Sequence, residues 1–297
     1  MDVDSDLVLP GLIDRPAGPA EVTVRHGDVP ENLPNPREDH ATYQVEGDRF
    51  LLTIPDVARF LLEGGKSITY QLVGDGDAAD AAIFILGTAF GILLHQRGDF
   101  VLHASAVRVG GHAILFAGSS GAGKSTMAAA LVKRGYPMIT DDVCAISLKK
   151  GDVPRVLSDG RQLKLWANSI ERLELADAKG AAVRNKIQKF YVTPSMTDDT
   201  PLPVGAVYLL REARTGGDTI QVTNFVDATL MLQRNCYRPR LVKALSQGAQ
   251  YLQASAAVVA KAGVFMFQRT IDFRAMDNVI ERLETHWRSL GFLEPLP

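Results

Sequence analysis

The alternation of hydrophobic and polar residues predicts short strands in the first third of the chain. Residues 41–54, ATYQVEGDRFLLTI, alternate on both sides of Gly47-Asp48, which indicates two strands joined by a tight turn. Residues 58–65, ARFLLEGG, are interpreted as a short helix ended by two glycines, and residues 67–73, SITYQLV, as another strand. Together these elements favour a small α+β unit.

Two further segments complete the expected N-terminal domain, which is placed at residues 1–98. Residues 1–39 are rich in Pro, Gly and Asp and lack periodicity, so a loop or loosely docked arm is expected there. Their acidic beginning is not typical of a secretory signal. Residues 81–96 form the longest uncharged run. Because a bilayer span needs roughly 20 apolar residues, this run predicts a buried helix and no membrane insertion.

The segment that follows changes from strands to an alternation of strands and helices. Residues 100–118, FVLHASAVRVGGHAILFAG, contain two β-rich runs around Gly110-Gly111 and predict an antiparallel hairpin that leads into a glycine-rich loop. An amphipathic helix is predicted at 124–134, and a brief strand at 137–140. This order is typical of an α/β fold in which the loop joins a strand to a helix.

The alternation continues to the end, so residues 99–297 are predicted to form a second, larger domain. Residues 178–204 are polar and aperiodic and are interpreted as irregular. The other predicted elements are a hairpin at 143–157 turning at Gly151-Asp152, strands at 162–166, 204–213 and 263–271, and helices at 169–176 with Ser169 as a possible N-cap, 227–237, 239–262 and 274–290.

Composition narrows the class of protein. The 297 residues are 46% hydrophobic and 22% charged, ordinary values for a globular chain. A net charge of −2 leaves no basic excess for nucleic acid, so no nucleic-acid partner is expected. Cys144 and Cys236 lie far apart and form neither a metal motif nor a disulfide framework. Their number fits a reducing compartment, and a cytoplasmic location is expected.

Residues 118–125, GSSGAGKS, fit the phosphate-loop pattern G-x-x-x-x-G-K-[ST]. Glycines let backbone N–H groups surround phosphate oxygens, and the following helix directs its positive dipole end at the same anion. Lys124 would add a full charge, and the Ser125 hydroxyl would bind Mg²⁺. The expected nucleotide-binding residues are Gly118, Ser119, Ser120, Gly121, Ala122, Gly123, Lys124, Ser125 and Thr126.

Two adjacent carboxylates, Asp141 and Asp142, end the strand eighteen residues after Lys124. The C-terminal edge of a sheet is where ligands of open α/β folds bind, and the loop opens there too if the two strands are parallel neighbours. One carboxylate would accept a hydroxyl proton while the other positions a metal, and their proximity predicts a raised pKa for one of them. The competing interpretation is a surface turn. His103 lies on the strand before the loop, and a lone histidine in a strand is usually a packed or solvated residue.

Residues 103–142 resemble the catalytic domain of the HPr kinase/phosphorylase family. That family has a histidine, a hairpin, G-x-S-G-x-G-K-S, a helix ending in Arg-Gly, and a strand closing on Asp-Asp, and the chain matches this order without a gap. The resemblance implies a mixed-sheet P-loop domain related to phosphoenolpyruvate carboxykinase, with ATP and Mg²⁺ bound.

The resemblance also implies roles for individual residues. Asp142 is implied as the proton acceptor from a substrate serine, and His103 as a partner of the aspartate pair. Lys124 is implied as a phosphate ligand, and Ser125, with Asp141, as a Mg²⁺ ligand. The expected partner is therefore a peptide or small protein with an acceptor serine, and a homo-oligomer is left open.

The departures from the family pattern are equally informative. Thr126 stands where a Glu normally follows the loop's Lys-Ser, and the family's Glu-[Ile/Val]-Arg-Gly signature is absent after the strand. The segments LKLW, KIQKF and VFMFQR instead resemble the HPr-kinase-like proteins of lasso-peptide biosynthesis clusters, which phosphorylate the C-terminal serine of a precursor peptide. Arg184, Lys186 and Lys189 are then either substrate or phosphate ligands, or a solvated basic loop.

Three other functions remain open. An HPr-type protein kinase in carbon regulation would share the same catalytic residues. A small-molecule kinase of the shikimate-kinase type also follows a glycine loop with an acidic strand end, although its loop usually lies near the N-terminus rather than at residue 118. A nucleotide-binding regulator without catalysis is the third, and the joint presence of His103, Lys124 and Asp142 argues against it.

Overall fold

The structure is a computed structural model, and it describes residues 2–12, 18–148, 153–158, 162–184, 187–213, 217–270 and 272–295. Contacts within the chain divide it into two compact units. Unit 1 comprises Met1–Val101 and Arg238–Gln250, and unit 2 comprises Leu102–Tyr237 and Tyr251–Pro297. The expected N-terminal domain of residues 1–98 falls within unit 1, which also takes in a short segment from late in the chain. Both units combine helices with a mixed sheet, so a mixed α/β fold is confirmed.

Unit 1 is built on a sheet in which β1, β2 and β7 are parallel and the remaining neighbours are antiparallel. The interpretation of residues 1–39 as a loop is wrong in part, because three strands form there by backbone pairing while burying few apolar side chains. In spatial order the strands are β1 Val3–Ser5, β2 Val22–His26, β7 Ser67–Leu72, β6 Ala58–Glu63, β5 Arg49–Ile54, β4 Tyr43–Glu46 and β3 Glu38–His40.

Strand β6 corrects the helix predicted at residues 58–65. Its side chains alternate, with Ala58, Phe60 and Leu62 fully buried, which is the period of a strand rather than of a helix. Gly64 and Gly65 both have positive φ angles, of 57° and 67°, and they turn the chain into β7 instead of ending a helix.

The apolar run forms one continuous helical segment that packs inside unit 1. It comprises α1 Ala78–Phe84, a π-helical turn η1 Ile85–Ala89, and α2 Phe90–Gln96. By length and hydropathy alone this segment would suffice to cross a membrane, but 67% of it is buried within the protein. Ile85 and Ile92 pack in the same core cluster as the sheet residues. The prediction of a buried helix is confirmed.

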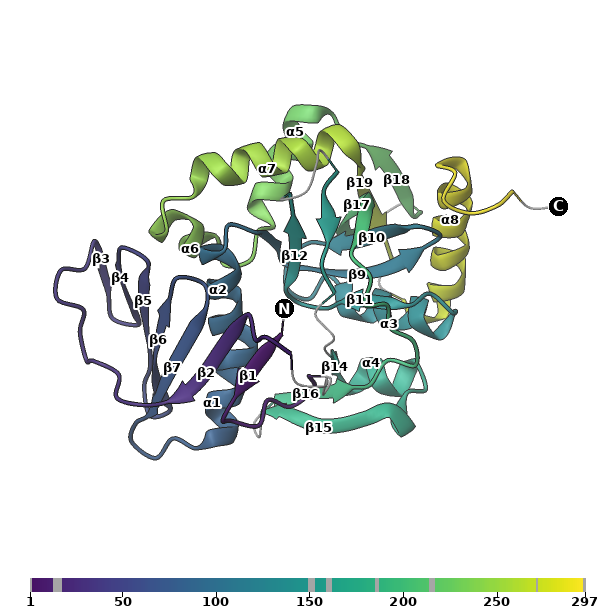
Figure 1. Cartoon of the computed structure of the whole chain (residues 1–297). Coiled ribbons are helices and arrows are strands. Elements are labelled where there is room, and N and C mark those ends of the chain that lie inside the picture. The colour runs from purple at the N-terminus through teal and green to yellow at the C-terminus, as the bar shows by residue number, and fades with distance from the viewer. Residues whose placement is uncertain are drawn as a thin grey trace. The chain divides into compact units, whose positions relative to one another are not determined.

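Unit 2 is built on a mixed sheet that carries the glycine-rich loop (Figure 1). Strands β10 and β17, and β17 and β19, are parallel, whereas β9 is antiparallel to both β10 and β11. The strands are β11 Met138–Thr140, β9 Ala104–Val109, β10 His112–Ala117, β17 Leu202–Glu212, β13 Arg155–Val156, β12 Cys144–Ser147, β18 Thr219–Val222 and β19 Gly263–Arg269, with β8 Phe100–Leu102 at the division between the units.

Helices pack on this sheet around a core that includes Phe116, Tyr208, Phe267 and Trp287. Most of them match the sequence prediction, but 239–262 forms two helices, separated near Ser246, whose φ angle is +56°. The helices are α3 Lys124–Lys133, α4 Ala167–Arg172, α5 Phe225–Arg234, α6 Pro239–Ala244 in unit 1, α7 Gly248–Lys261 across the division, and α8 Met276–Ser289, with short 3₁₀ turns η2 Ala176–Ala178 and η3 Phe273–Ala275.

A separate three-stranded sheet replaces the irregular segment predicted at 178–204. It consists of β14 Leu163–Trp166, β16 Ile187–Val192 and β15 Lys179–Arg184, all antiparallel. Its strands are polar on the exposed face, which weakened the sequence signal. Ser169 is also not a helix cap, because α4 begins two residues earlier and Trp166 occupies the N-cap position.

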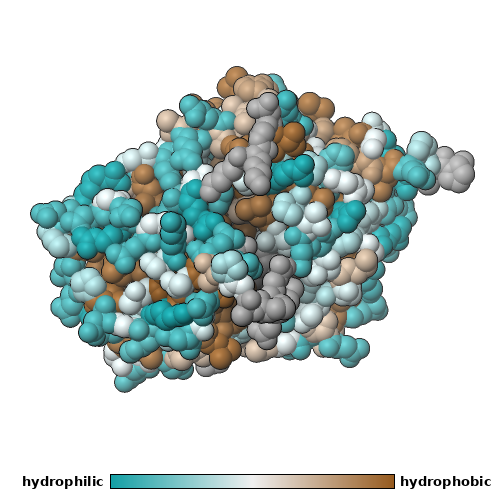
Figure 2. All heavy atoms as spheres, in the orientation of Figure 1, coloured by the Kyte–Doolittle hydropathy of each residue, from teal (hydrophilic) through white to brown (hydrophobic). Residues whose placement is uncertain are grey.

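Several of the exposed large apolar side chains of unit 2 lie on α5 and the neighbouring end of β18. Phe225, Val226 and Leu230 on α5, and Val222 on β18, are all more than 40% exposed. Figure 2 shows hydrophobic residues at the top of the drawn face, where α5 lies in Figure 1; elsewhere on this face they occur in small groups among hydrophilic residues.

Candidate active site

Three strand ends meet at one edge of the unit 2 sheet. Because β9 lies between β10 and β11 and is antiparallel to both, β10 and β11 run in the same direction. The two strands are parallel but not neighbours, whereas a shared edge was expected only if they were parallel neighbours. Their C-terminal ends nevertheless share an edge with the N-terminal end of β9. The loop after β10, Asp141 and Asp142 after β11, and His103 before β9 are brought together there.

The loop after β10 adopts a conformation that depends on glycine. Gly118, Gly121 and Gly123 have φ angles of 148°, 84° and 85°, in a region that side chains rarely allow. Helix α3 begins at Lys124, so the N–H groups of its first turn have no partner within the helix. Ser119, Ser120 and Gly121 are exposed. The loop thus offers free backbone donors and a positive helix end to an anion.

Lys124 is folded across this loop. Its Nζ donates hydrogen bonds to the carbonyl oxygens of Gly118, at 2.9 Å, and Ser119, at 3.1 Å, and the residue is 6% exposed. Burial lowers the pKa of Lys124, the nearby charges of Asp141 and Asp142 oppose that shift, and Lys189 adds to it. The ammonium is therefore held at the mouth of the loop by weak acceptors that a phosphate oxygen would replace.

Asp141 is a buried carboxylate surrounded by donors. Its Oδ1 accepts hydrogen bonds from the hydroxyls of Ser105, at 2.6 Å, and Ser125, at 2.8 Å. Its Oδ2 accepts from the backbone N–H of Lys164, at 3.2 Å. This carboxylate therefore ties β9, α3 and β14 together beside the loop and orients the Ser125 hydroxyl.

Asp142 points to a different set of groups. Its backbone has a φ of +74°, which turns its side chain away from that of its neighbour. Its Oδ1 lies 3.2 Å from Nδ1 of His103, and its Oδ2 lies 3.5 Å from Nζ of Lys164. The backbone N–H of His103 donates to the carbonyl of Asn235, which anchors the histidine. Asp142 is thus a half-buried carboxylate between two nitrogen donors.

The expectation of a raised pKa for one aspartate is wrong for Asp142. Burial alone would raise the pKa of this carboxyl, but the hydrogen bond from His103 and the charges of Lys164, His103 and Lys189 outweigh burial and hold the pKa well below its usual range. The two carboxylates have separate donors, Ser105 and Ser125 for Asp141 and His103 and Lys164 for Asp142. Asp142 is ionised at neutral pH.

Residues 97–172 match the family model of the HPr serine kinase C-terminal domain.

This match bears out the HPr-kinase-like resemblance for that segment, which includes the loop, His103, Asp141 and Asp142, and it indicates a kinase type of domain. It covers about a quarter of the chain. The solved structure of the Hpr(Ser) kinase/phosphatase from Coxiella burnetii aligns with 63% of this chain and 95% of its own, at 12% identity and a TM-score of 0.34. At this TM-score the solved structure carries no argument about the fold of the chain. No curated protein matches the chain.

Sequence reasoning missed three residues of the site. Ser105 and Lys164 lie inside the HPr-kinase-like segment and bind the aspartates, and Arg269, at the end of β19, contacts the loop. The alternation of LKLW, with its leucines in the core, places Lys164 on the opposite face and could have revealed it. Arg269 comes from a strand whose pairing the sequence did not define, and Ser105, although on the predicted hairpin, carried no motif of its own.

The remaining predicted residues fall in different places. The hydroxyl of Thr126 is hydrogen bonded to that of Ser169, at 3.1 Å, so only the backbone N–H of Thr126 is offered to a phosphate. Lys189 is close enough to lower the pKa of both Asp142 and Lys124. Lys186 and the side chain of Arg184 lie outside the described residues, as does the predicted turn at 151–152.

The oxygen ligands for Mg²⁺ are present at this edge. Within the described ranges no three His, Cys, Asp or Glu side chains form a metal cluster. Mg²⁺ bound with a nucleotide needs only one or two protein oxygens, since phosphates and water complete its shell. The Ser125 hydroxyl and the Asp141 carboxylate supply two such oxygens 2.8 Å apart. These residues fit the predicted metal.

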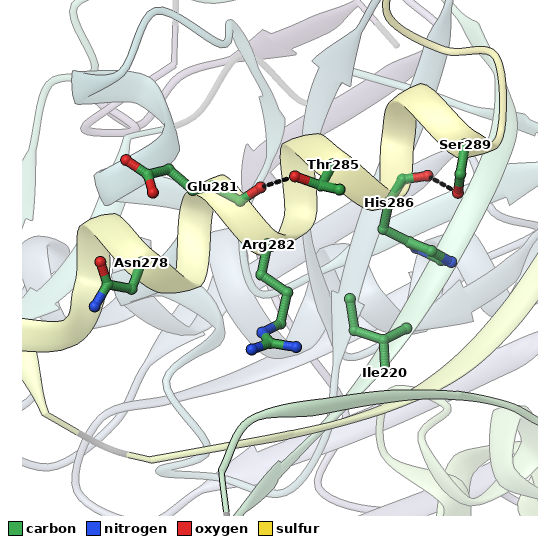
Figure 3. Close-up of a pocket in the computed structure, with 7 residues that line it drawn as sticks. All are labelled: Ile220, Asn278, Glu281, Arg282, Thr285, His286 and Ser289. Carbon is green, nitrogen blue, oxygen red and sulfur yellow. Dashed lines mark hydrogen bonds between the residues drawn. The ribbon is translucent and has the colours of Figure 1, made fainter.

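A cavity lies elsewhere in unit 2. It measures about 550 Å³, between β18 and α8, and no loop residue lines it. Figure 3 shows that the hydroxyls of Thr285 and Ser289 are hydrogen bonded to carbonyls of their own helix. Nδ1 of His286 is 2.7 Å from the hydroxyl of Tyr208. Three of the polar side chains that line the cavity thus have partners within the protein, whereas the loop edge combines free backbone donors with two carboxylates and is the stronger candidate.

Proposed function

We propose that the protein is an ATP-dependent serine kinase that transfers the γ-phosphoryl group of ATP to a serine hydroxyl of a peptide or small protein. The observation that carries this proposal is the shared sheet edge. An anion-binding loop, a carboxylate that orients Ser125, and a second, ionised carboxylate held by His103 lie together there. The HPr serine kinase match over residues 97–172 supports the same reaction type.

The loop and its lysine bind and orient the phosphates. The free N–H groups of the loop and of the first turn of α3 surround phosphate oxygens, and Lys124 exchanges its carbonyl contacts for one of them. Ser125 and Asp141 would hold Mg²⁺, which would neutralise phosphate charge. Little covalent chemistry is required of the protein, because positioning and charge stabilisation supply most of the rate.

Asp142 receives the proton of the acceptor. The serine oxygen forms a bond to the γ-phosphorus as the bond to the bridging oxygen breaks, ADP leaves, and the hydroxyl proton passes to the carboxylate. Since the pKa of Asp142 is lowered, this carboxylate first orients the hydroxyl as a hydrogen-bond acceptor. It takes the proton late, when the forming bond to phosphorus has made the hydroxyl strongly acidic.

The acceptor proposed is the C-terminal serine of a lasso-peptide precursor in the cytoplasm. Its support is the resemblance of LKLW, KIQKF and VFMFQR to that subgroup, together with the position of LKLW at the site, where it supplies Lys164. An HPr-type protein is an equally consistent acceptor, because its serine would need the same loop and carboxylates.

The test is intact-mass analysis of acceptors incubated with the full chain, ATP and Mg²⁺. A serine-ending precursor peptide is compared with the same peptide ending in alanine and with HPr. A gain of one phosphoryl group on the serine peptide alone supports the peptide kinase, and a gain on HPr alone supports the protein kinase. ATP binding without transfer to any hydroxyl would overturn the proposed activity and leave a nucleotide-binding regulator.

A further inference from the structure

Arg269 is a buried cation beneath the glycine-rich loop. It is 3% exposed, and its Nη2 donates a hydrogen bond to the carbonyl oxygen of Ala122 at 3.0 Å. Its Nε has no hydrogen-bond partner within the described part of the chain. No carboxylate among the described residues lies within ion-pair distance of it, although Asp218 is near enough to act on its charge. Burying a charged guanidinium that lacks an ion-pair partner is costly in free energy.

The contact with Ala122 fixes one peptide plane of the loop. Peptide bonds are planar, and the chain has no cis bond among the described residues. In a trans peptide the carbonyl and the following N–H point in opposite directions. Because the Ala122 carbonyl points to Arg269, the N–H of Gly123 points away from it, and no acceptor among the described residues receives that N–H.

The backbone of Gly123 packs directly against the guanidinium of Arg269. A Cβ atom at this position would lie 2.2 Å from Nη2 of Arg269, so no side chain fits while Arg269 is in place. The residue also has a φ of +85° and is the N-cap of α3. The arginine and the glycine are therefore packed as one unit at the base of the loop.

We propose that Arg269 is a positioning residue for the nucleotide phosphates. Through the Ala122 carbonyl it holds the Gly123 N–H toward the bound anion, and its buried charge adds to the positive field of the loop. The proposal rests on the loop binding a nucleotide, as in the proposed function. It also accounts for a guanidinium that has no carboxylate within ion-pair distance among the described residues, since a phosphate nearby compensates a buried positive charge.

The experiment compares Arg269→Gln, Arg269→Lys and Arg211→Gln in the full chain. Arg211 is an exposed arginine on β17, the strand paired with β19, and serves as the matched control. Mg-ADP is the binding probe. Loss of a hydrogen bond from a charged group predicts affinity weaker by about tenfold or more for Arg269→Gln. Arg269→Lys keeps the positive charge but lacks the planar guanidinium, so it should recover part of the lost ADP affinity. Arg211→Gln should bind Mg-ADP as the wild type does.

A second measurement separates positioning from a structural role. Removing an unpaired buried charge should leave the Tm of the ligand-free protein unchanged or higher, while the Tm increase produced by Mg-ADP shrinks. A lowered ligand-free Tm with wild-type ADP affinity would overturn the proposal, as would wild-type affinity alone. If the wild type binds ADP but phosphorylates no acceptor, the kinase function fails and the role of Arg269 is still decided by the ADP titration.

Discussion

The candidate site has two parts that differ in how the chain assembles them. The first, residues 103–142, is continuous in sequence and supplies the loop, His103 and the two aspartates from three adjacent strand ends. The second comes from distant strands, with Lys164 on β14 and Arg269 on β19. The continuous part contains the groups that would touch the reacting atoms. The distant part holds those groups in place and influences their charge. Substitutions in the continuous part should therefore reduce turnover directly, and substitutions in the distant part should act through the groups that they hold.

The largest effect is expected in the continuous part, from Asp142→Asn. The amide keeps the size of the side chain but takes no proton, so kcat should fall by about 10²–10⁴-fold while Mg-ATP affinity stays near wild type. Phosphate transfer and equilibrium binding, measured on the same preparation, check this. Wild-type turnover in this variant would remove Asp142 from the proposed chemistry.

An intermediate effect is expected in the distant part, from Lys164→Gln. The charge of Lys164 helps to hold the pKa of Asp142 down, so its loss should raise that pKa. A lowered pKa keeps the carboxylate ionised above it, and activity is lost as the pH falls through it. Loss of activity in the variant should therefore begin at a higher pH than in the wild type.

The pH dependence of kcat/KM, from neutral to acidic pH, measures this shift. Lys133→Gln is the control, because Lys133 pairs with the exposed Glu174 on the surface. An unchanged acidic limb in Lys164→Gln would show that this lysine does not set the charge of Asp142. The same pKa direction means that the ionised Asp142 stabilises the fold at neutral pH, and that this contribution is lost as acid protonates it.

The smallest effect is expected from Thr126→Val. The sequence placed Thr126 among the nucleotide ligands, whereas its hydroxyl is bonded to the buried Ser169. Losing that bond should lower the free energy of unfolding by about 1–2 kcal/mol, with KM for ATP unchanged. Chemical denaturation measures the free energy of unfolding, and steady-state kinetics measure the KM for ATP. A raised KM with unchanged stability would return Thr126 to the nucleotide site.

The same comparison explains what the sequence could predict. The 103–142 segment has local signals, because Gly110-Gly111 defines a hairpin and the glycine loop joins a strand to a helix, and both elements are confirmed. Arg269 lacked such a signal, since its position depends on β19 pairing with β17 across more than fifty residues. Asp142 shows a second limit. Because Asp141 precedes it directly, the sequence predicted that the two carboxylates would interact and that one pKa would be raised. The positive φ of Asp142, +74°, instead directs its side chain to other partners.

The N-terminal sheet shows where pattern reasoning failed for the fold. ARFLLEGG was interpreted as a helix, although Ala58, Phe60 and Leu62 alternate with partly exposed residues as a strand requires. A segment of six residues with four apolar side chains is too short to be assigned by periodicity alone, because the strands that pair with it, β5 and β7, lie outside the segment. Short edge strands such as β3 bury almost nothing and leave no pattern to find.

The discontinuous make-up of unit 1 has a consequence for biosynthesis. Leu241 and Ala244 on α6 belong to the same apolar core as the strands near the N-terminus, and Arg37 donates a hydrogen bond to the carbonyl of Ala244. The ribosome makes α6 only after nearly all strands of the unit 2 sheet. Unit 1 is therefore translated first but can complete its core only after α6 is made, by which time the loop and the aspartates of unit 2 have already been synthesised. A fragment that ends before residue 238 would leave that core permanently incomplete.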